Sequence, residues 1–92
     1  MKALRKRPGE AWEEAEIENT LEALQHEVGG YFETVTLLSD LALIVNKEGR
    51  INGRRFNMEL CGMQLFGTVL AVGFKGDEFC DIPGTHLKDI LY

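Results

Sequence analysis

Residues 19–37 read NTLEALQHEVGGYFETVTL, and they decide the fold because they contain a complete helix, its end and the strand that follows. Asn19 is predicted to cap the helix, and Glu22, three residues later, completes a capping box. The apolar residues of this segment recur on one helical face, at Leu21, Leu24 and Val28. A helix this short is marginal alone in water. We therefore expect a helix over residues 20–28 whose apolar face packs on a sheet.

Two glycines end this helix. Gly29 is predicted to take the left-handed conformation that closes a helix, and Gly30 to release the chain into a strand over residues 31–37. A helix end presents carbonyl groups, so a phosphate-binding loop is not predicted at this point. Gly67-Thr68 lacks the Gly-x-x-x-x-Gly-Lys pattern of a phosphate-binding loop. Its glycine is therefore interpreted, like Gly29 and Gly30, as serving the backbone conformation.

Further strands are predicted where apolar residues alternate or form short continuous runs. They are residues 3–7, 12–18, 41–45, 50–52, 67–74 and 79–82. Pro8-Gly9 predicts a type II turn that joins the first two strands into a hairpin. Residues 41–45 are apolar on both faces, which indicates a central strand covered on both sides.

The middle of the chain contains the segment that is hardest to assign. Residues 46–49 predict a hairpin turn, with Gly49 in a left-handed position and residues 50–52 as the return strand. Residues 53–60 allow two interpretations, an irregular loop or a turn of helix from Asn57.

The last expected element is a short helix that follows Pro83-Gly84 and has Thr85 as its N-cap. Its packing face consists of Leu87, Ile90 and Leu91. Together these elements predict an α+β fold, a mostly antiparallel sheet of five or six strands. The helix of residues 20–28 lies across one face, and the C-terminal helix closes an end of the core. A chain of 92 residues has room for one core, so residues 1–92 are expected to form a single compact domain.

Charge is unevenly distributed along the chain, whose net charge is −5. Residues 9–40 carry nine carboxylates and no Lys or Arg, whereas residues 1–8 carry four basic side chains. An acidic total argues against general nucleic-acid binding. The apolar runs are too short to span a bilayer, and no apolar run follows the basic residues 1–7 as it would in a signal peptide. The expected location is therefore the cytoplasm, with neither a membrane nor a nucleic acid as direct partner.

The residue types that bind metals or act as nucleophiles show no recognisable spacing. The residues concerned are Cys61, Cys80, His26 and His86, and they form neither a Cys-x-x-Cys nor a His-x-x-x-His pair. We interpret both cysteines as reduced, at least one of them packed as a small hydrophobe. No nucleophile has a base beside it in a local motif. No catalytic residue, metal site or cofactor is therefore predicted, and an enzyme is the least favoured class.

One candidate binding surface is acidic. Three glutamates alternate along one predicted strand and project from the same face: Glu14, Glu16 and Glu18. A solvated face is favoured over an acid/base cluster, because nothing apolar nearby would favour the protonated carboxyl. The same face is the candidate surface for a basic partner. The competing use of these carboxylates is pairing across the hairpin with the basic residues Arg5, Lys6 and Arg7.

A second candidate lies in the segment Gly53–Asn57. Its polar residues are Arg54, Arg55 and Asn57. Two guanidinium groups, the ring of Phe56 and an amide are together suited to clamp a planar anionic ligand such as a nucleotide. The alternative is an exposed loop anchored by a buried Phe56.

The chain also resembles a known family in Met1-Lys2-Ala3-Leu4, Pro8-Gly9, Ile17 to Gln25, Val28 to Tyr31, Asn46 to Gly49, Asn57 and Gly67-Thr68. This family contains small uncharacterised proteins carried by phages, prophages and plasmids, grouped as a domain of unknown function. The segment Asn19 to Tyr31 is the most specific part of the resemblance. The sequence departs from the family at Arg5-Lys6-Arg7, usually apolar, and at Arg54-Arg55, where a proline-containing loop is common. The resemblance implies a mobile-element setting and supplies no catalytic residues.

These observations lead to an expected function. The protein is a non-enzymatic accessory protein of a phage or mobile element that inhibits a bacterial defence system, as an anti-CRISPR protein does. It would bind a basic host protein, such as a nucleic-acid-binding nuclease, through the acidic face of Glu14, Glu16 and Glu18. The alternative is sequestration of a small nucleotide-type signalling ligand near Arg54, Arg55 and Asn57. The sequence leaves the oligomeric state open, with a homodimer among the options.

Overall fold

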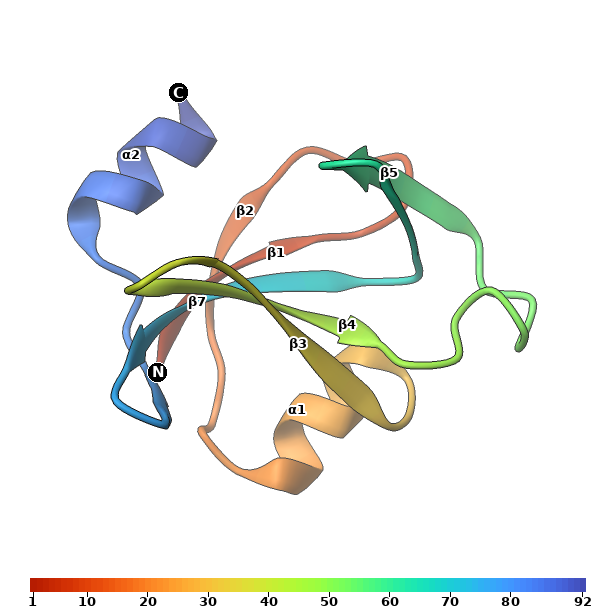
Figure 1. Cartoon of the computed structure of the whole chain (residues 1–92), viewed down its shortest axis with the longest axis horizontal. Coiled ribbons are helices and arrows are strands. Elements are labelled where there is room, and N and C mark those ends of the chain that lie inside the picture. Colours follow the sequence, from red (N-terminus) through yellow and green to blue (C-terminus); the bar gives the residue numbers. More distant parts are fainter.

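A six-stranded antiparallel sheet forms the middle layer of the computed structural model, which describes residues 1–92 (Figure 1). Five strands run in the order β2-β1-β7-β4-β3, and β8 pairs with the end of β7. Their bounds are β1 Lys2–Lys6, β2 Glu13–Glu16, β3 Phe32–Leu38, β4 Leu41–Asn46, β7 Val69–Lys75 and β8 Glu78–Cys80. All of these strand pairs are antiparallel. The predicted α+β class, with a mostly antiparallel sheet, is confirmed.

Different elements cover the two faces of this sheet. Helix α1 (Leu21–Val28) lies on one face, and helix α2 (Gly84–Leu91) and the hairpin of β5 (Phe56–Leu60) and β6 (Met63–Phe66) lie on the other (Figure 1). The buried apolar residues accordingly form two clusters, one on each side of the sheet. Neither helix is long and apolar enough to cross a membrane.

The two innermost strands are buried on both sides. All six residues of β4 are buried, as are the first five of β7. A strand that packs against other layers on both faces has apolar residues in succession rather than in alternation. The prediction of a doubly covered strand over residues 41–45 is therefore confirmed.

The first hairpin forms as predicted. Pro8 and Gly9 make the turn, Gly9 has φ +79°, and the N–H of Glu10 donates to the carbonyl of Arg7 at 3.0 Å. This positive φ at the third position is the requirement of a type II turn. Strand β2 is shorter than expected, and its Glu13 lies opposite Arg5.

Helix α1 begins one residue later than expected. Thr20, not Asn19, is the N-cap, and its hydroxyl accepts from the N–H of Ala23 at 3.2 Å. The side-chain amide of Asn19 instead donates to the carbonyl of Phe79, beside the sheet, at 3.0 Å. The end of the helix is as predicted, because Gly29 is left-handed with φ +83°.

The predictions for residues 46–60 were mostly wrong: a turn does follow residue 46, but Gly49 does not have the left-handed conformation expected of it. Residues 47–53 form consecutive turns, and the return strand expected at residues 50–52 is absent. Asn57 lies in strand β5, neither in a loop nor in a helix, and β5 pairs with β6 in a separate two-stranded sheet. Cys61 and Gly62, both with positive φ, make the tight turn between these strands. Apolar side chains of the hairpin pack on the second face of the main sheet, and this packing stabilises its short strands.

Helix α2 begins earlier than predicted. Its N-cap is Pro83, with no side-chain cap, so the assignment of Thr85 as N-cap was wrong. Pro83 has φ −57° and ψ 140°, an extended conformation like that of other N-cap residues. Leu87, Ile90 and Leu91 pack against the second apolar cluster as expected. The helix therefore lies on a face of the sheet, and His86 Nε2 joins it to Asp40 Oδ1 at 2.8 Å.

Candidate functional site

The three glutamates of the predicted acidic face are exposed; we call them the acidic edge: Glu14, Glu16 and Glu18. Strand β2 is at the edge of the sheet, and Glu18 follows it in the connection to α1. Only Glu16 has an ionic partner, the amino group of Met1 at 3.1 Å, and its side chain is 78% exposed. The carboxylates of Glu14 and Glu18 make no ion pair and accept no hydrogen bond from another side chain.

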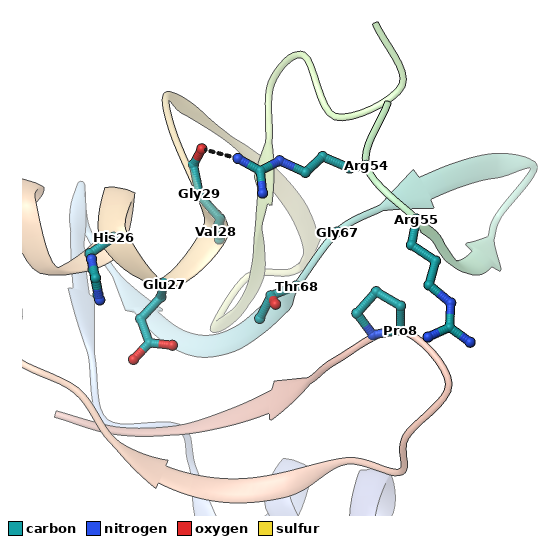
Figure 2. A pocket seen from close by; sticks show the side chains of 9 residues that line it. All are labelled: Pro8, His26, Glu27, Val28, Gly29, Arg54, Arg55, Gly67 and Thr68. Carbon is teal, nitrogen blue, oxygen red and sulfur yellow. Dashed lines mark hydrogen bonds between the residues drawn. The ribbon is translucent and has the colours of Figure 1, made fainter. Parts of the chain in front are cut away.

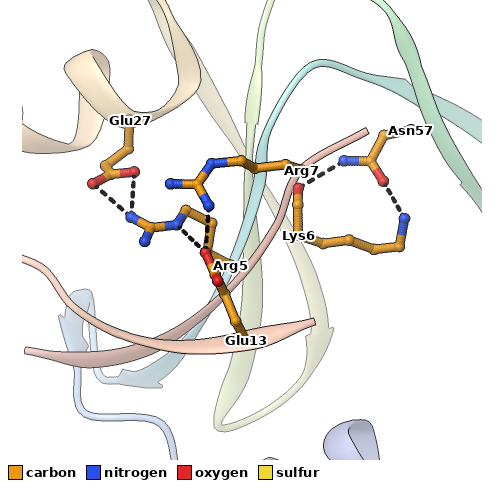
Figure 3. A network of polar contacts seen from close by, with 6 residues as sticks. All are labelled: Arg5, Lys6, Arg7, Glu13, Glu27 and Asn57. Carbon is orange, nitrogen blue, oxygen red and sulfur yellow. Dashed lines mark hydrogen bonds and ion pairs between the residues drawn. The ribbon is translucent and has the colours of Figure 1, made fainter. Parts of the chain in front are cut away.

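The basic residues of the hairpin bind other groups (Figure 3). Arg5 donates from Nε to Glu13 at 2.9 Å, and from Nη1 to both carboxylate oxygens of Glu27 at 3.0 Å. Arg7 donates to Glu13 at 2.6 Å, and Lys6 donates from Nζ to the side-chain oxygen of Asn57 at 2.8 Å. The competing use of the acidic edge, internal pairing with these residues, is therefore absent.

This network shifts two pKa values. The hydrogen bond from Arg5 holds the pKa of the Glu13 carboxyl below its ordinary value, with a smaller coulombic contribution from Arg7. The same hydrogen bond raises the pKa of the Arg5 guanidinium, against a lowering by burial. The carboxylate of Glu13 and the guanidinium of Arg5 therefore remain charged at neutral pH. The negative charge of Glu27 is balanced by its ion pair with Arg5.

A cavity of about 300 Å³ lies beside this network (Figure 2). Its walls come from the Pro8 turn, the end of α1, Arg54-Arg55 and Gly67-Thr68. Its lining is mostly polar: Val28 is the only hydrophobic residue among nine, and no Phe, Tyr or Trp is present. A pocket of this volume is large enough for a small ligand.

Arg54 closes one side of the cavity. Its Nη2 donates to the carbonyl of Gly29 at 2.6 Å, which satisfies an acceptor at the end of α1. A Cβ on Gly29 would lie 2.6 Å from the same nitrogen, so the arginine head would have to move aside, and glycine is needed there chiefly for its φ of +83°. One N–H of five is used in this hydrogen bond, which leaves the others free to donate.

Arg55 lies on the other side, next to Pro8 (Figure 2). Its guanidinium makes no ion pair and no hydrogen bond within the protein. The Cβ of a residue replacing Gly9 would lie 3.2 Å from Arg55 Nη2, so the guanidinium rests on the turn of the first hairpin. Arg55 therefore supplies unused donors to the cavity.

Asn57 lies apart from Arg54 and Arg55. Its side chain is buried, donates to the carbonyls of Lys6 and Gly67 at 2.8 and 2.7 Å, and accepts from Lys6 Nζ. Asn57 therefore joins β1, β5 and the start of the segment before β7, and it does not line the cavity. Phe56 is half exposed and packs edge-on against Phe66, so it is not a buried anchor.

The remaining walls of the cavity come from residues that the sequence did not single out as ligand contacts. The glycines at the end of α1 and at Gly67-Thr68 were assigned only a role in backbone conformation, yet both segments line the cavity. No sequence signal connects them, because four separate segments meet at this point.

The cysteines and histidines are dispersed. Cys61 is exposed in the turn between β5 and β6, Cys80 is half-buried, and both thiols are free. His26 and His86 lie in different helices. No group of three or more His, Cys, Asp or Glu side chains is placed to hold a metal ion.

The chain belongs to the family described as a domain of unknown function (DUF3846), which matches residues 1–91. The resemblance to a domain of unknown function is thereby confirmed over nearly the whole chain. No curated protein and no solved structure shows significant similarity to it.

Proposed function

We propose that the protein is a non-enzymatic binding protein, encoded by a phage or other mobile element, that inhibits a bacterial defence system by occupying a host protein. Its contact surface is the acidic edge, and its partner is a basic, nucleic-acid-binding defence protein in the host cytoplasm. The mode of action is that of an anti-CRISPR protein, and this part of the proposal rests on analogy.

One observation carries this proposal: the acidic edge is exposed and largely unpaired, although four basic residues lie within the first eight of the chain. Two of these basic residues, Arg5 and Arg7, pair with Glu13 and Glu27 instead. Carboxylates without internal partners are available to a basic surface, where they accelerate association and favour the correct orientation. A short charged edge strand also discourages self-association. Removal of the charges distinguishes this role from partner binding, because only partner binding requires them for association with the host protein.

The test is replacement of all three glutamates of the acidic edge with glutamine, which keeps shape and removes charge. A pull-down from host lysate supplies the partner, and its association rate with wild type and variant is measured at low and high salt. The variant should fold normally, because exposed charges contribute little to stability. Its association should be slower, most clearly at low salt, where screening is weak.

The matched control removes the same number of charges elsewhere, by replacing the exposed residues Glu48, Glu59 and Glu78 with glutamine. This control should associate at nearly the rate of wild type. If the edge variant associates at the wild-type rate at low salt, the acidic edge is not the contact surface.

A second candidate function is favoured by the cavity of Arg54 and Arg55: sequestration of a small nucleotide-type signalling ligand. Asn57 would position the cavity wall without touching the ligand, because its amide is fully bonded within the protein. Salt separates the two functions, since a ligand held inside a cavity responds less to ionic strength than an encounter between exposed charges.

A further inference from the structure

We propose that the cavity between Arg54 and Arg55 binds the diphosphate group of its ligand and does not recognise a base. This inference rests on the second candidate function, ligand sequestration, and narrows it to one chemistry. A free diphosphate and a nucleoside diphosphate share this chemistry.

The charge around the cavity favours an anion. Among the residues that line the cavity, Arg54 and Arg55 against Glu27 give a formal charge of +1, in a chain whose net charge is −5. The one acidic group of the wall, Glu27, is already engaged by Arg5, and the carbonyl oxygen of Gly29 accepts from Arg54. The remaining donors of Arg54 and all those of Arg55 are therefore available to an anion, with no carboxylate of the protein bound to them.

The placement of the donors favours two linked phosphates. In the view of Figure 2 the two guanidinium groups are well separated: that of Arg54 reaches toward Gly29, and that of Arg55 lies beside Pro8. Thr68 also lines the cavity. The hydroxyl of Thr68 makes no hydrogen bond with another side chain. Arginine binds phosphate oxygens in a planar, often bidentate geometry. A diphosphate offers oxygens to two separate donor groups at once, which a single phosphate, with its smaller span, does less well.

The cavity offers no surface for a base. Proteins that recognise bases stack them on aromatic rings and bind their edges with amide groups. The cavity lining contains no Phe, Tyr or Trp. The ring of Phe56 packs on Phe66. The buried side chain of Asn57 uses both N–H groups within the protein and its oxygen accepts from Lys6 Nζ, so neither of the two groups expected to hold a base is available.

The test is an NMR and calorimetric titration of the full chain in a phosphate-free buffer of low ionic strength. The probes are inorganic pyrophosphate, inorganic phosphate, adenosine diphosphate and adenosine. Pyrophosphate and adenosine diphosphate should bind within about threefold of each other, phosphate roughly tenfold more weakly, and adenosine not at all. The amide signals of Gly29 and Thr68 should shift with pyrophosphate, because both residues line the cavity.

Arg55→Gln is the decisive variant, because Arg55 makes no bond within the protein that the substitution would break. It should weaken pyrophosphate binding about tenfold or more, as expected for the loss of a charge-assisted hydrogen bond. Arg50→Gln is the matched control, since Arg50 is an exposed arginine that lies over Phe66 and outside this cavity. Its affinity should equal that of wild type.

Three outcomes would overturn the inference in distinguishable ways. Pyrophosphate binding that Arg55→Gln leaves unchanged places the anion elsewhere. Adenosine binding, with adenosine diphosphate more than about tenfold tighter than pyrophosphate, shows recognition of the base; the inference then fails while ligand sequestration stands. If none of the probes binds, both the inference and nucleotide sequestration fail.

Discussion

Arg54 and Gly29 form a close contact at the end of helix α1, where the guanidinium Nη2 lies 2.6 Å from the glycine carbonyl oxygen. The two residues are 25 positions apart in the chain. The contact caps the negative end of the helix with a positive charge, an arrangement that the helix dipole favours. It also fixes one wall of the cavity, so the stability of α1 and the shape of the cavity depend on the same pair.

Gly29→Ala should lower the free energy of unfolding by about 1–2 kcal/mol or more, because it puts a side chain at a left-handed position. The new Cβ would also lie 2.6 Å from Arg54 Nη2 and force the guanidinium to move. Urea denaturation measures the loss. Gly53→Ala is the control, since Gly53 has φ +71° and no atom lies within 4 Å of the position that its Cβ would take. An equal loss in both variants would mean that displacement of Arg54 costs nothing.

Leu24→Ala should destabilise the protein by about 2–5 kcal/mol, the cost of a buried cavity. Leu24 is 2% exposed and packs on the first face of the sheet, whereas Leu21 on the same helix is 58% exposed. Leu21→Ala is therefore the matched control and should change stability by roughly 0.5 kcal/mol or less. Thermal or urea unfolding compares the two. Similar losses would contradict the packing of α1 through Leu24.

Asn57→Ala should cost roughly 2 kcal/mol or more, because it leaves the buried carbonyl of Gly67 and the partly buried carbonyl of Lys6 without this donor. Asn52→Ala, at an exposed position in the preceding turns, is the control and should be nearly neutral. Urea denaturation gives both values. Unchanged stability in Asn57→Ala would contradict its structural role and return Asn57 to the candidates for ligand contact.

Acid should weaken the fold partly through Glu13. Its pKa is lowered in the folded state by the hydrogen bond from Arg5, so folding favours the ionised carboxylate. This stabilisation is present above the ordinary glutamate pKa of roughly 4.3 and is lost as the pH falls through the lowered folded value. Melting temperatures measured between neutral pH and acid should therefore fall more steeply for wild type than for Glu13→Gln. Glu14→Gln, at an unpaired neighbour, should keep the wild-type slope.

The sequence by itself determined the features that depend on a few neighbouring residues. The left-handed end of α1 at Gly29, the turn at Pro8-Gly9 and the continuous apolar run of β4 are local, because backbone sterics and burial pattern act over a few positions. The predicted N-cap, Asn19, was wrong by one residue because of a contact between residues far apart in the sequence. Asn19 and Thr20 can both cap a helix, but the amide of Asn19 is held by the carbonyl of Phe79.

Only the tertiary structure decided which charges pair and which remain free. Arg5 meets Glu27 across 22 positions, and Lys6 meets Asn57 across 51, so no sequence spacing predicts either contact. The short strands β5 and β6 carry weak patterns and are stabilised by packing on the main sheet. Because the hairpin arginines are bonded to Glu13 and Glu27, the fold leaves Glu14 and Glu18 of the acidic edge without partners, and Arg55 is likewise unpaired.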